Sequence, residues 1–304
     1  MSPFYIAGPT GAGKSSVALA LAQRCRGEIV NADAFQIYRG LDIITAKPSP
    51  KDLAAVPHHL YSVIDPGDSF NAARFAELAR PCIDQILSRD KPALVTGGTG
   101  LYLKSLTHGL SDLPQASPEL RAELEALPLE ELVARLKELD PVGATQTNLA
   151  NKRYVQRALE ITIQSGTPMS TLKTDWQQDA APPAPIHGVV LTRPREELYQ
   201  RINHRVQTMF DQGAVEEVAG APALSPTAEK AIGIAEIRAL LAGLIDRQTC
   251  IEQIQQATRR FAKRQITWFK KEKAFQTICL APTDTPESTC EKIFRLFPDL
   301  NPNT

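Results

Sequence analysis

Residues 4–15 read FYIAGPTGAGKS, and this stretch decides the fold. A short apolar run ends at Gly8, a glycine-rich turn follows, and apolar residues then recur at helical spacing after Ser15. The turn fits the phosphate-loop pattern G-x-x-x-x-G-K-[ST] at every fixed position. Its backbone N–H groups can curl around an anion, and the following helix adds its positive N-terminal end. We therefore predict a loop that binds a diphosphate or triphosphate through Gly8, Pro9, Thr10, Gly11, Ala12, Gly13, Lys14 and Ser15.

Two side chains of this loop supply what a bound phosphate requires. Lys14 brings a full positive charge, and the Ser15 hydroxyl is the kind of group that binds Mg²⁺ in phosphate loops. We therefore expect Mg²⁺ as the cofactor, with Ser15 as its ligand on the protein. The loop alone does not tell which phosphate compound is bound or what is done with it.

Apolar runs alternate with helical patterns along much of the chain. Runs at 28–32, 93–96 and 188–192 have strand character, and apolar positions recur at helical spacing over 70–87. Strands that alternate with helices are typical of βαβ units and a parallel sheet. We therefore predict an α/β fold whose core is a P-loop NTPase-like parallel sheet flanked by helices.

The pattern changes in the middle of the chain, where 118 to about 165 looks wholly helical. We predict that a helical insertion domain, residues 112–185, interrupts the core. The two parts of the core are then residues 1–111 and 186–304. In the second part, a single helix is expected from about 196 to 218.

The overall charge argues against a uniformly basic nucleic-acid binder. Lys+Arg and Asp+Glu both number 34, so the net charge is zero. The distribution is uneven, because seven basic residues and one acid lie between Arg259 and Lys273. A neutral total can therefore hide a basic face.

No targeting or membrane signal is visible in the chain. The first residues lead straight into the glycine-rich turn, and no apolar run approaches the ~18 residues that span a membrane. The five cysteines are scattered without Cys-x-x-Cys spacing, which is typical of reduced thiols and disfavours a zinc site. We expect a cytoplasmic protein with no membrane contact.

Asp33 is a second candidate for chemistry. It lies where the strand at 28–32 should end, and the carboxyl ends of strands in open α/β sheets face the ligand crevice. Asp33 could bind magnesium through water, act as a general base, or cap a turn. Nearby, the Gln36 amide can both donate and accept, as recognition of an adenine edge requires.

Further motifs follow in order along the chain. They cover the segment 33–48, PHHL at 57–60, GGTGLY at 97–102, RALE at 157–160 and AKRQITWF at 262–269. With the phosphate loop, they resemble the tRNA dimethylallyltransferases (isopentenyl-diphosphate:tRNA transferases) of the bacterial type, nearly from end to end. The chain departs from the family pattern at a few positions, among them Ala34, Ile44, Ile234 and Ala235.

The resemblance implies a prenyl transfer. The loop would hold dimethylallyl diphosphate by its leaving group while N6 of the adenine at position 37 of tRNA attacks the allylic carbon. The products would be N6-isopentenyladenosine and diphosphate. A stacked base must flip out to react, which costs a few kcal/mol, and least in a single-stranded loop. The implied partners are therefore dimethylallyl diphosphate and the anticodon stem-loop of tRNA, with no protein partner and a monomeric enzyme.

The resemblance also implies roles for single residues. Asp33 would be the base, Thr10 would hydrogen-bond the bridging oxygen of the leaving group, and Arg205 would neutralise the diphosphate together with Lys14 and Mg²⁺. Arg205 lies one helical turn after Arg201 in a family motif. The helical insertion, residues 112–185, is implied to bind tRNA. The single residues implied to bind tRNA are Asp33, Ala34, Phe35, Gln36, Thr99, Arg121, Arg153 and Arg157.

Two other functions fit part of the sequence. A small-molecule or nucleotide kinase would use the loop, Asp33 and a mobile helical insertion. Its lid should be rich in arginine, whereas the first helix of this insertion is net acidic. A non-enzymatic RNA-binding protein would keep a vestigial loop, but Lys14, Ser15 and Asp33 are intact.

Overall fold

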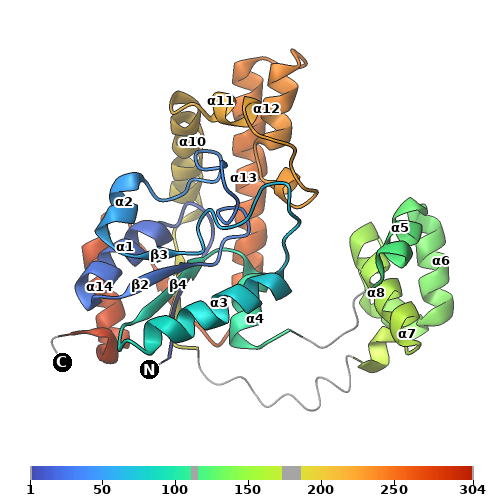
Figure 1. The fold of residues 1–304 in the computed structure, drawn as a ribbon, viewed down its shortest axis with the longest axis horizontal. Coiled ribbons are helices and arrows are strands. Elements are labelled where there is room, and N and C mark those ends of the chain that lie inside the picture. The colour runs from blue at the N-terminus through green and yellow to red at the C-terminus, as the bar shows by residue number, and fades with distance from the viewer. Residues whose placement is uncertain (1, 111–115, 173–185, 303–304) are drawn as a thin grey trace. The chain divides into compact units, whose positions relative to one another are not determined.

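The computed structural model describes residues 2–110, 116–172 and 186–302. The chain forms two compact units, one made of Met1–Gly109 with Ala184–Thr304 and the other of Leu110–Pro183 (Figure 1). We call them the core unit and the helical unit. The boundaries predicted from the sequence, 112 and 185, lie outside the described residues. Each unit has a hydrophobic core of its own.

The core unit is built on a parallel sheet of six strands among the described residues, in the order β3-β2-β4-β1-β5-β6. The strands are β1 (Phe4–Ala7), β2 (Glu28–Asn31), β3 (His58–His59), β4 (Ala93–Gly97), β5 (Gly188–Thr192) and β6 (Gln276–Cys279). The register sets Tyr5 of the central strand opposite Val95 on one side and Gly188 on the other. The predicted parallel sheet is confirmed.

Helices cover both faces of this sheet. They are α1 (Lys14–Cys25), α2 (Pro50–Ala55), α3 (Ala72–Leu87), α4 (Gly100–Thr107), α10 (Arg195–Asp211), α11 (Ala214–Ala219), α12 (Ile234–Leu241), α13 (Arg247–Phe269) and α14 (Pro286–Leu296). Successive side chains of a strand point to opposite faces, so Phe4 and Ile6 enter one core with α1 and α14, while Tyr5 and Ala7 enter another with α3 and α4. The strands are therefore apolar throughout. Within the described residues, no helix combines the length and the apolar character needed to cross a membrane.

The parallel strands bring their carboxyl ends to one edge of the sheet. The phosphate loop follows β1, Asp33 lies just after β2, Thr99 just after β4 and Arg193 just after β5. The ends of β2 and β4 approach so closely that a Cβ on Gly97 would lie 2.2 Å from the Ala32 carbonyl oxygen. Residues far apart in the sequence are thereby gathered around the loop.

The single helix predicted for 196–218 is wrong in one respect, because the structure has two helices there. Helix α10 ends at Asp211, and α11 begins at Ala214. Between them, Gly213 has a φ of 97°, in the left-handed region that ends helices and that glycine adopts without strain. The break lets α11 leave the direction of α10.

The helical unit is built from the helices α5 (Pro118–Ala126), α6 (Leu129–Leu139), α7 (Pro141–Gln146) and α8 (Lys152–Ser165), and residues 169–172 are helical as well. Leu124, Leu132 and Leu136 are fully buried and pack with Val155 and Leu159 of α8. These apolar positions recur at helical spacing, which is why one face of each helix turns inward. The predicted helical insertion is confirmed in its secondary structure.

Candidate active site

The phosphate loop, residues 8–15, depends on its glycines for its shape. Gly8 has a φ of 144°, and a Cβ there would lie 2.3 Å from the Leu191 carbonyl oxygen. Gly13 has a φ of 95° and caps α1, whose first residue is Lys14. The unpaired N–H groups at the start of this helix therefore face the loop, where they and the helix dipole stabilise an anion.

Lys14 is the cation inside the loop. Its Nζ donates a hydrogen bond to the Pro9 carbonyl oxygen at 3.0 Å. Burial lowers the pKa of Lys14 to about 8, while Asp33 opposes this shift and Arg205 adds to it. An anion bound beside Lys14 would favour its charged form and raise the pKa again.

Helix α10 presents two arginines to the loop, one turn apart. Arg205 donates from Nη2 to the Thr10 hydroxyl at 2.7 Å, and Arg201 donates from Nε to the Gly11 carbonyl oxygen at 2.9 Å. Burial lowers the pKa of Arg205, although a guanidinium remains charged in proteins. The Arg205 Nε is buried and has no hydrogen-bond partner among the described residues. Arg205 therefore keeps a donor for a ligand.

Gln265 of α13 links the loop to the end of β4. Its Oε1 accepts from the Thr10 N–H at 2.8 Å, and its Nε2 donates to the Gly98 carbonyl oxygen at 2.8 Å. The side chain is buried, so both ends of the amide need such partners. Gln265 belongs to the AKRQITWF motif at 262–269, but the motif does not indicate that its side chain binds the phosphate loop.

Asp33 is held by a turn of its own. Its Oδ1 accepts from the Phe35 N–H at 3.0 Å, while its own N–H donates to Asn31 Oδ1 at 2.9 Å. The next residue, Ala34, donates its N–H to the Thr99 hydroxyl at 3.0 Å. The Asp33 Oδ2 makes no hydrogen bond within the described part of the chain, so one carboxylate oxygen remains able to accept a proton.

The segment after Asp33 is fixed by its own polar contacts. Gln36 donates from Nε2 to the carbonyl oxygens of Thr45 and Ala46 at 3.0 and 2.9 Å. Glu217 of α11 accepts from the backbone N–H groups of Asp42, Ile43 and Ile44. The Gln36 amide nitrogen is thus engaged inside the protein, and the reading of an adenine by Gln36 stays a prediction.

One cavity of about 490 Å³ joins these groups. Its polar wall includes Thr10, Lys14, Ser15, Asp33 and Arg205. Apolar side chains form much of the remaining wall: Phe35, Ile44, Val206, Met209, Ile232, Ile254 and Phe261. The three residues predicted to be catalytic therefore share a cavity that is cationic at the loop and partly apolar elsewhere.

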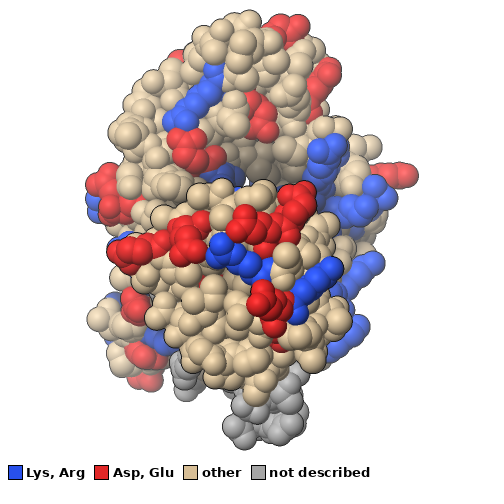
Figure 2. Space-filling model, turned by 90° about the vertical axis from the view of Figure 1, so that its right-hand side faces the viewer, with Lys and Arg blue, Asp and Glu red and all other residues tan. Residues whose placement is uncertain are grey.

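The other arginines predicted to bind tRNA lie in the helical unit. Arg121 and Arg157 both pair with the buried carboxylate of Glu160, at 3.6 and 3.1 Å, while Arg153 is exposed. Figure 2 shows acidic and basic side chains interspersed on the face that it views, so no single sign of charge covers that face. The role of these arginines in binding tRNA stays a prediction.

Comparison with known proteins gives the same family over nearly the whole chain. Residues 36–272 match the family model described as IPP transferase, and residues 1–61 match that of isopentenyl transferase. The chain is 45% identical over 289 residues to the tRNA dimethylallyltransferase of Akkermansia muciniphila, covering 95% of this chain and 97% of that protein.

Solved structures agree with this match. The tRNA isopentenylpyrophosphate transferase of Bacillus halodurans is 32% identical, with a TM-score of 0.69 over 98% of this chain and 96% of its own. A eukaryotic dimethylallyltransferase acting on tRNA is 25% identical, with a TM-score of 0.83 over 99% of this chain and 79% of its own. The motifs, the fold and these likenesses all lead to one conclusion: the chain belongs to the tRNA dimethylallyltransferase family.

Proposed function

We propose that this protein transfers the dimethylallyl group of dimethylallyl diphosphate to N6 of the adenine at position 37 of tRNA, next to the anticodon. One observation carries the proposal: Asp33, the Thr10–Arg205 pair and the cationic phosphate loop line the same cavity. Such a cavity can hold a leaving diphosphate and a proton acceptor together. Because the substrate is tRNA, the proposal places the reaction in the cytoplasm.

The transfer exchanges one bond for another. The bond from N6 to the allylic carbon forms as the bond from that carbon to the diphosphate oxygen breaks, and N6 loses a proton. Asp33 takes this proton on Oδ2, which makes no hydrogen bond to the residues that the structure describes, while its Oδ1 is held by the turn. Lys14 and Arg205 stabilise the negative charge that grows on the leaving diphosphate. Thr10, oriented by Arg205, donates to the bridging oxygen.

Mg²⁺ fits this site as a metal held mainly by its substrate. Among the described residues no cluster of three or more His, Cys, Asp or Glu side chains could hold a metal ion. The Ser15 hydroxyl lies in the same cavity as Lys14, and Mg²⁺ commonly binds one or two protein groups while substrate phosphates and water complete its shell. Bound there through Ser15, Mg²⁺ would add positive charge at the diphosphate.

The adenine must leave the anticodon loop to reach this cavity. Flipping a single-stranded base costs a few kcal/mol, which stacking and backbone contacts can offset. Phe35 and Gln36 line the cavity, and Thr99 fixes the backbone beside Asp33. We assign these residues, with Ala34, Arg121, Arg153 and Arg157, to tRNA binding by one protein monomer.

The experiment that separates this function from a kinase follows the fate of two phosphate donors. The protein is incubated with Mg²⁺ and tRNA, and with either dimethylallyl diphosphate or ATP. We expect diphosphate release that requires both tRNA and the prenyl donor, and no release or transfer of the ATP γ-phosphate. Transfer of that phosphate without prenyl transfer would contradict the proposal and favour the kinase.

The pKa of Lys14 predicts how binding of the donor depends on pH. In the free enzyme Lys14 is charged below about pH 8, and the bound diphosphate raises its pKa. Binding therefore takes up a proton above pH 8, and affinity falls by up to about tenfold per pH unit as the pH rises. We expect kcat/KM for the donor to fall between pH 8 and 9.5. The Lys14→Met variant should have a lower kcat/KM at every pH and should lack this fall. An equal fall in the wild type and the variant would show that another group titrates.

A further inference from the structure

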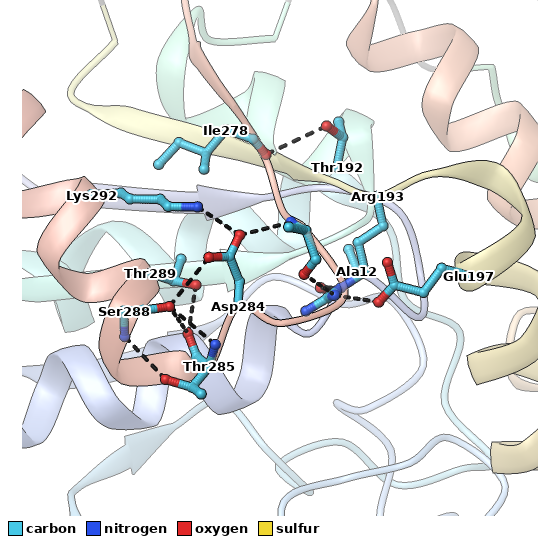
Figure 3. Close-up of polar contacts among 11 residues, drawn as sticks. Ala12, Thr192, Arg193, Glu197, Ile278, Asp284, Thr285, Ser288, Thr289 and Lys292 are labelled. Carbon is cyan, nitrogen blue, oxygen red and sulfur yellow. Dashed lines mark hydrogen bonds and ion pairs between the residues drawn. The ribbon is translucent and has the colours of Figure 1, made fainter.

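Arg193 binds the phosphate loop and is not among the residues that line the cavity described above. It lies between β5 and α10, and its side chain is only 7% exposed. Its Nε donates to the Ala12 carbonyl oxygen at 3.0 Å (Figure 3). Arg201 and Arg205 bind the two preceding residues of the loop. The loop is therefore held by three arginines from one connected segment, of which Arg193 has no role in the chemistry proposed above.

The Arg193 guanidinium is itself fixed by two acceptors. Its Nη1 donates to the carboxylate of Glu197, one turn further along, and to the Ala281 carbonyl oxygen at 3.2 Å. The Glu197 Oε2 is buried and has no hydrogen-bond partner among the described residues. A buried carboxylate is costly unless it is paired, so Glu197 and Arg193 are held together.

The Ala281 carbonyl group is anchored by the segment that leads into α14. Ala281 donates its N–H to Asp284 Oδ2 at 2.7 Å, and Lys292 of α14 binds the same oxygen at 2.6 Å. Helix α14 packs against α1, the helix that begins in the loop. Figure 3 shows these contacts running from the helix at the end of the chain through Asp284 and Arg193 to Ala12.

The geometry points to Arg193 as a positioning residue that sets the phosphate loop for diphosphate. A peptide group is planar and trans, so its carbonyl oxygen and its N–H point in opposite directions. When Arg193 holds the Ala12 carbonyl outward, the N–H of Gly13 points inward, where the anion binds. If this hydrogen bond is lost, the peptide between Ala12 and Gly13 can rotate more freely, because Gly13 has no side chain to restrict it. This positioning role of Arg193 rests on the proposed function in one respect only, namely that the ligand of the loop is a diphosphate.

The test compares binding of inorganic diphosphate in the presence of Mg²⁺ with steady-state kinetics of the full chain. Arg193→Gln should weaken diphosphate binding and raise the KM for the donor by about tenfold, because one charge-assisted hydrogen bond to the loop is lost. It should leave kcat and the KM for tRNA within about twofold, since Arg193 does not touch the reacting atoms. Arg193→Lys keeps the charge but not the forked donors of the guanidinium, so its diphosphate affinity should lie between those of the wild type and Arg193→Gln.

A matched control is Arg195→Gln, two residues further on, where the arginine is exposed and its Nε binds only Tyr199. It should bind diphosphate like the wild type. Glu197→Gln should reproduce part of the Arg193→Gln loss, and the double variant should add little, because the two residues act as one unit. If thermal unfolding shows that Arg193→Gln folds poorly, the diphosphate affinity of the milder Glu197→Gln variant tests the positioning role in its place.

A merely structural role would lower the melting temperature and the active fraction while leaving the diphosphate affinity of the folded molecules unchanged. Wild-type affinity in folded Arg193→Gln or Glu197→Gln would therefore overturn the positioning role. The outcome is independent of the proposed transfer. If the wild type bound diphosphate but modified no tRNA, the proposed function would fail, while a weakened Arg193→Gln would still support the positioning role.

Discussion

Replacing Asp33 with asparagine is expected to slow prenyl transfer about 10³-fold, within the range that general bases contribute. Asparagine keeps the side-chain oxygen that accepts from the Phe35 N–H, so the turn that holds position 33 should survive. What it loses is the ability to take the proton from the adenine N6. The rate should be measured in a single turnover with enzyme in excess over tRNA, where substrate binding no longer limits it.

The matched control is Asp68→Asn, an exposed aspartate of the core unit outside the cavity, which should transfer at the wild-type rate. Binding of tRNA and of the donor to Asp33→Asn should stay within a few-fold of the wild type, because the loop and its cations are unchanged. A single-turnover rate within tenfold of the wild type would show that Asp33 is not the base. A general loss of binding would assign it to substrate contact instead.

Replacing Arg205 with glutamine is expected to lower kcat by a factor of about 10² to 10³, as removal of one donor to a developing negative charge does. Arg205 donates to the Thr10 hydroxyl, and its buried Nε has no partner in the part of the chain that the structure describes. In the proposed mechanism Arg205 stabilises a charge that grows as the diphosphate leaves. We therefore expect kcat to fall by a larger factor than the KM for the donor rises. Arg205→Lys, which keeps one point charge, should be intermediate.

Thr10→Val tests whether the pair works as a unit. Thr10→Val should lower kcat by a smaller factor than Arg205→Gln does. The double variant should have a kcat only slightly below that of Arg205→Gln alone, because Thr10 depends on Arg205 for its orientation. Fully additive losses would show that the two residues act independently. An Arg205→Gln variant with unchanged kcat and a raised KM would reassign Arg205 to ground-state binding.

The parts of the fold that could be predicted are those with a local signal in the sequence. The phosphate loop combines an apolar strand, fixed glycines and a helix within about a dozen residues, so one window contains the whole pattern. Asp33 could be placed because a strand end in a parallel sheet faces the ligand edge, and the structure has it in the cavity. By contrast, β3 has only two residues, too few for any periodicity.

The contacts of the remaining site residues could not be predicted, because their partners are distant in the sequence. Gln265 binds the loop across 255 positions and Arg193 across 181. Gln265 belongs to the motif at 262–269, yet neither its neighbours nor those of Arg193 indicate the partner, because only the packed fold brings these residues to the loop. Arg201 belongs to a motif, but its contact with the Gly11 carbonyl oxygen follows only from the register of α10.

Two departures from the family pattern lie in the packed interior. Ile44 and Ile234 are both buried in the same hydrophobic core, and a Cβ on Gly233 would lie 2.4 Å from Ile44 Cδ1. Ile44 thus fills the space beside a glycine whose φ is 107°. These apolar residues are accommodated by packing, and neither belongs to the polar wall of the cavity.

The most direct test of the proposed transfer is to find the product in tRNA. Unmodified tRNA is incubated with the protein, Mg²⁺ and dimethylallyl diphosphate, then cut into fragments and sequenced by mass spectrometry. We expect a single added prenyl group on the adenine next to the anticodon, which is absent when the donor is omitted and greatly reduced with Asp33→Asn. Unmodified tRNA from protein that is folded and binds the donor, or a prenyl group on a different nucleotide, would contradict the proposed function.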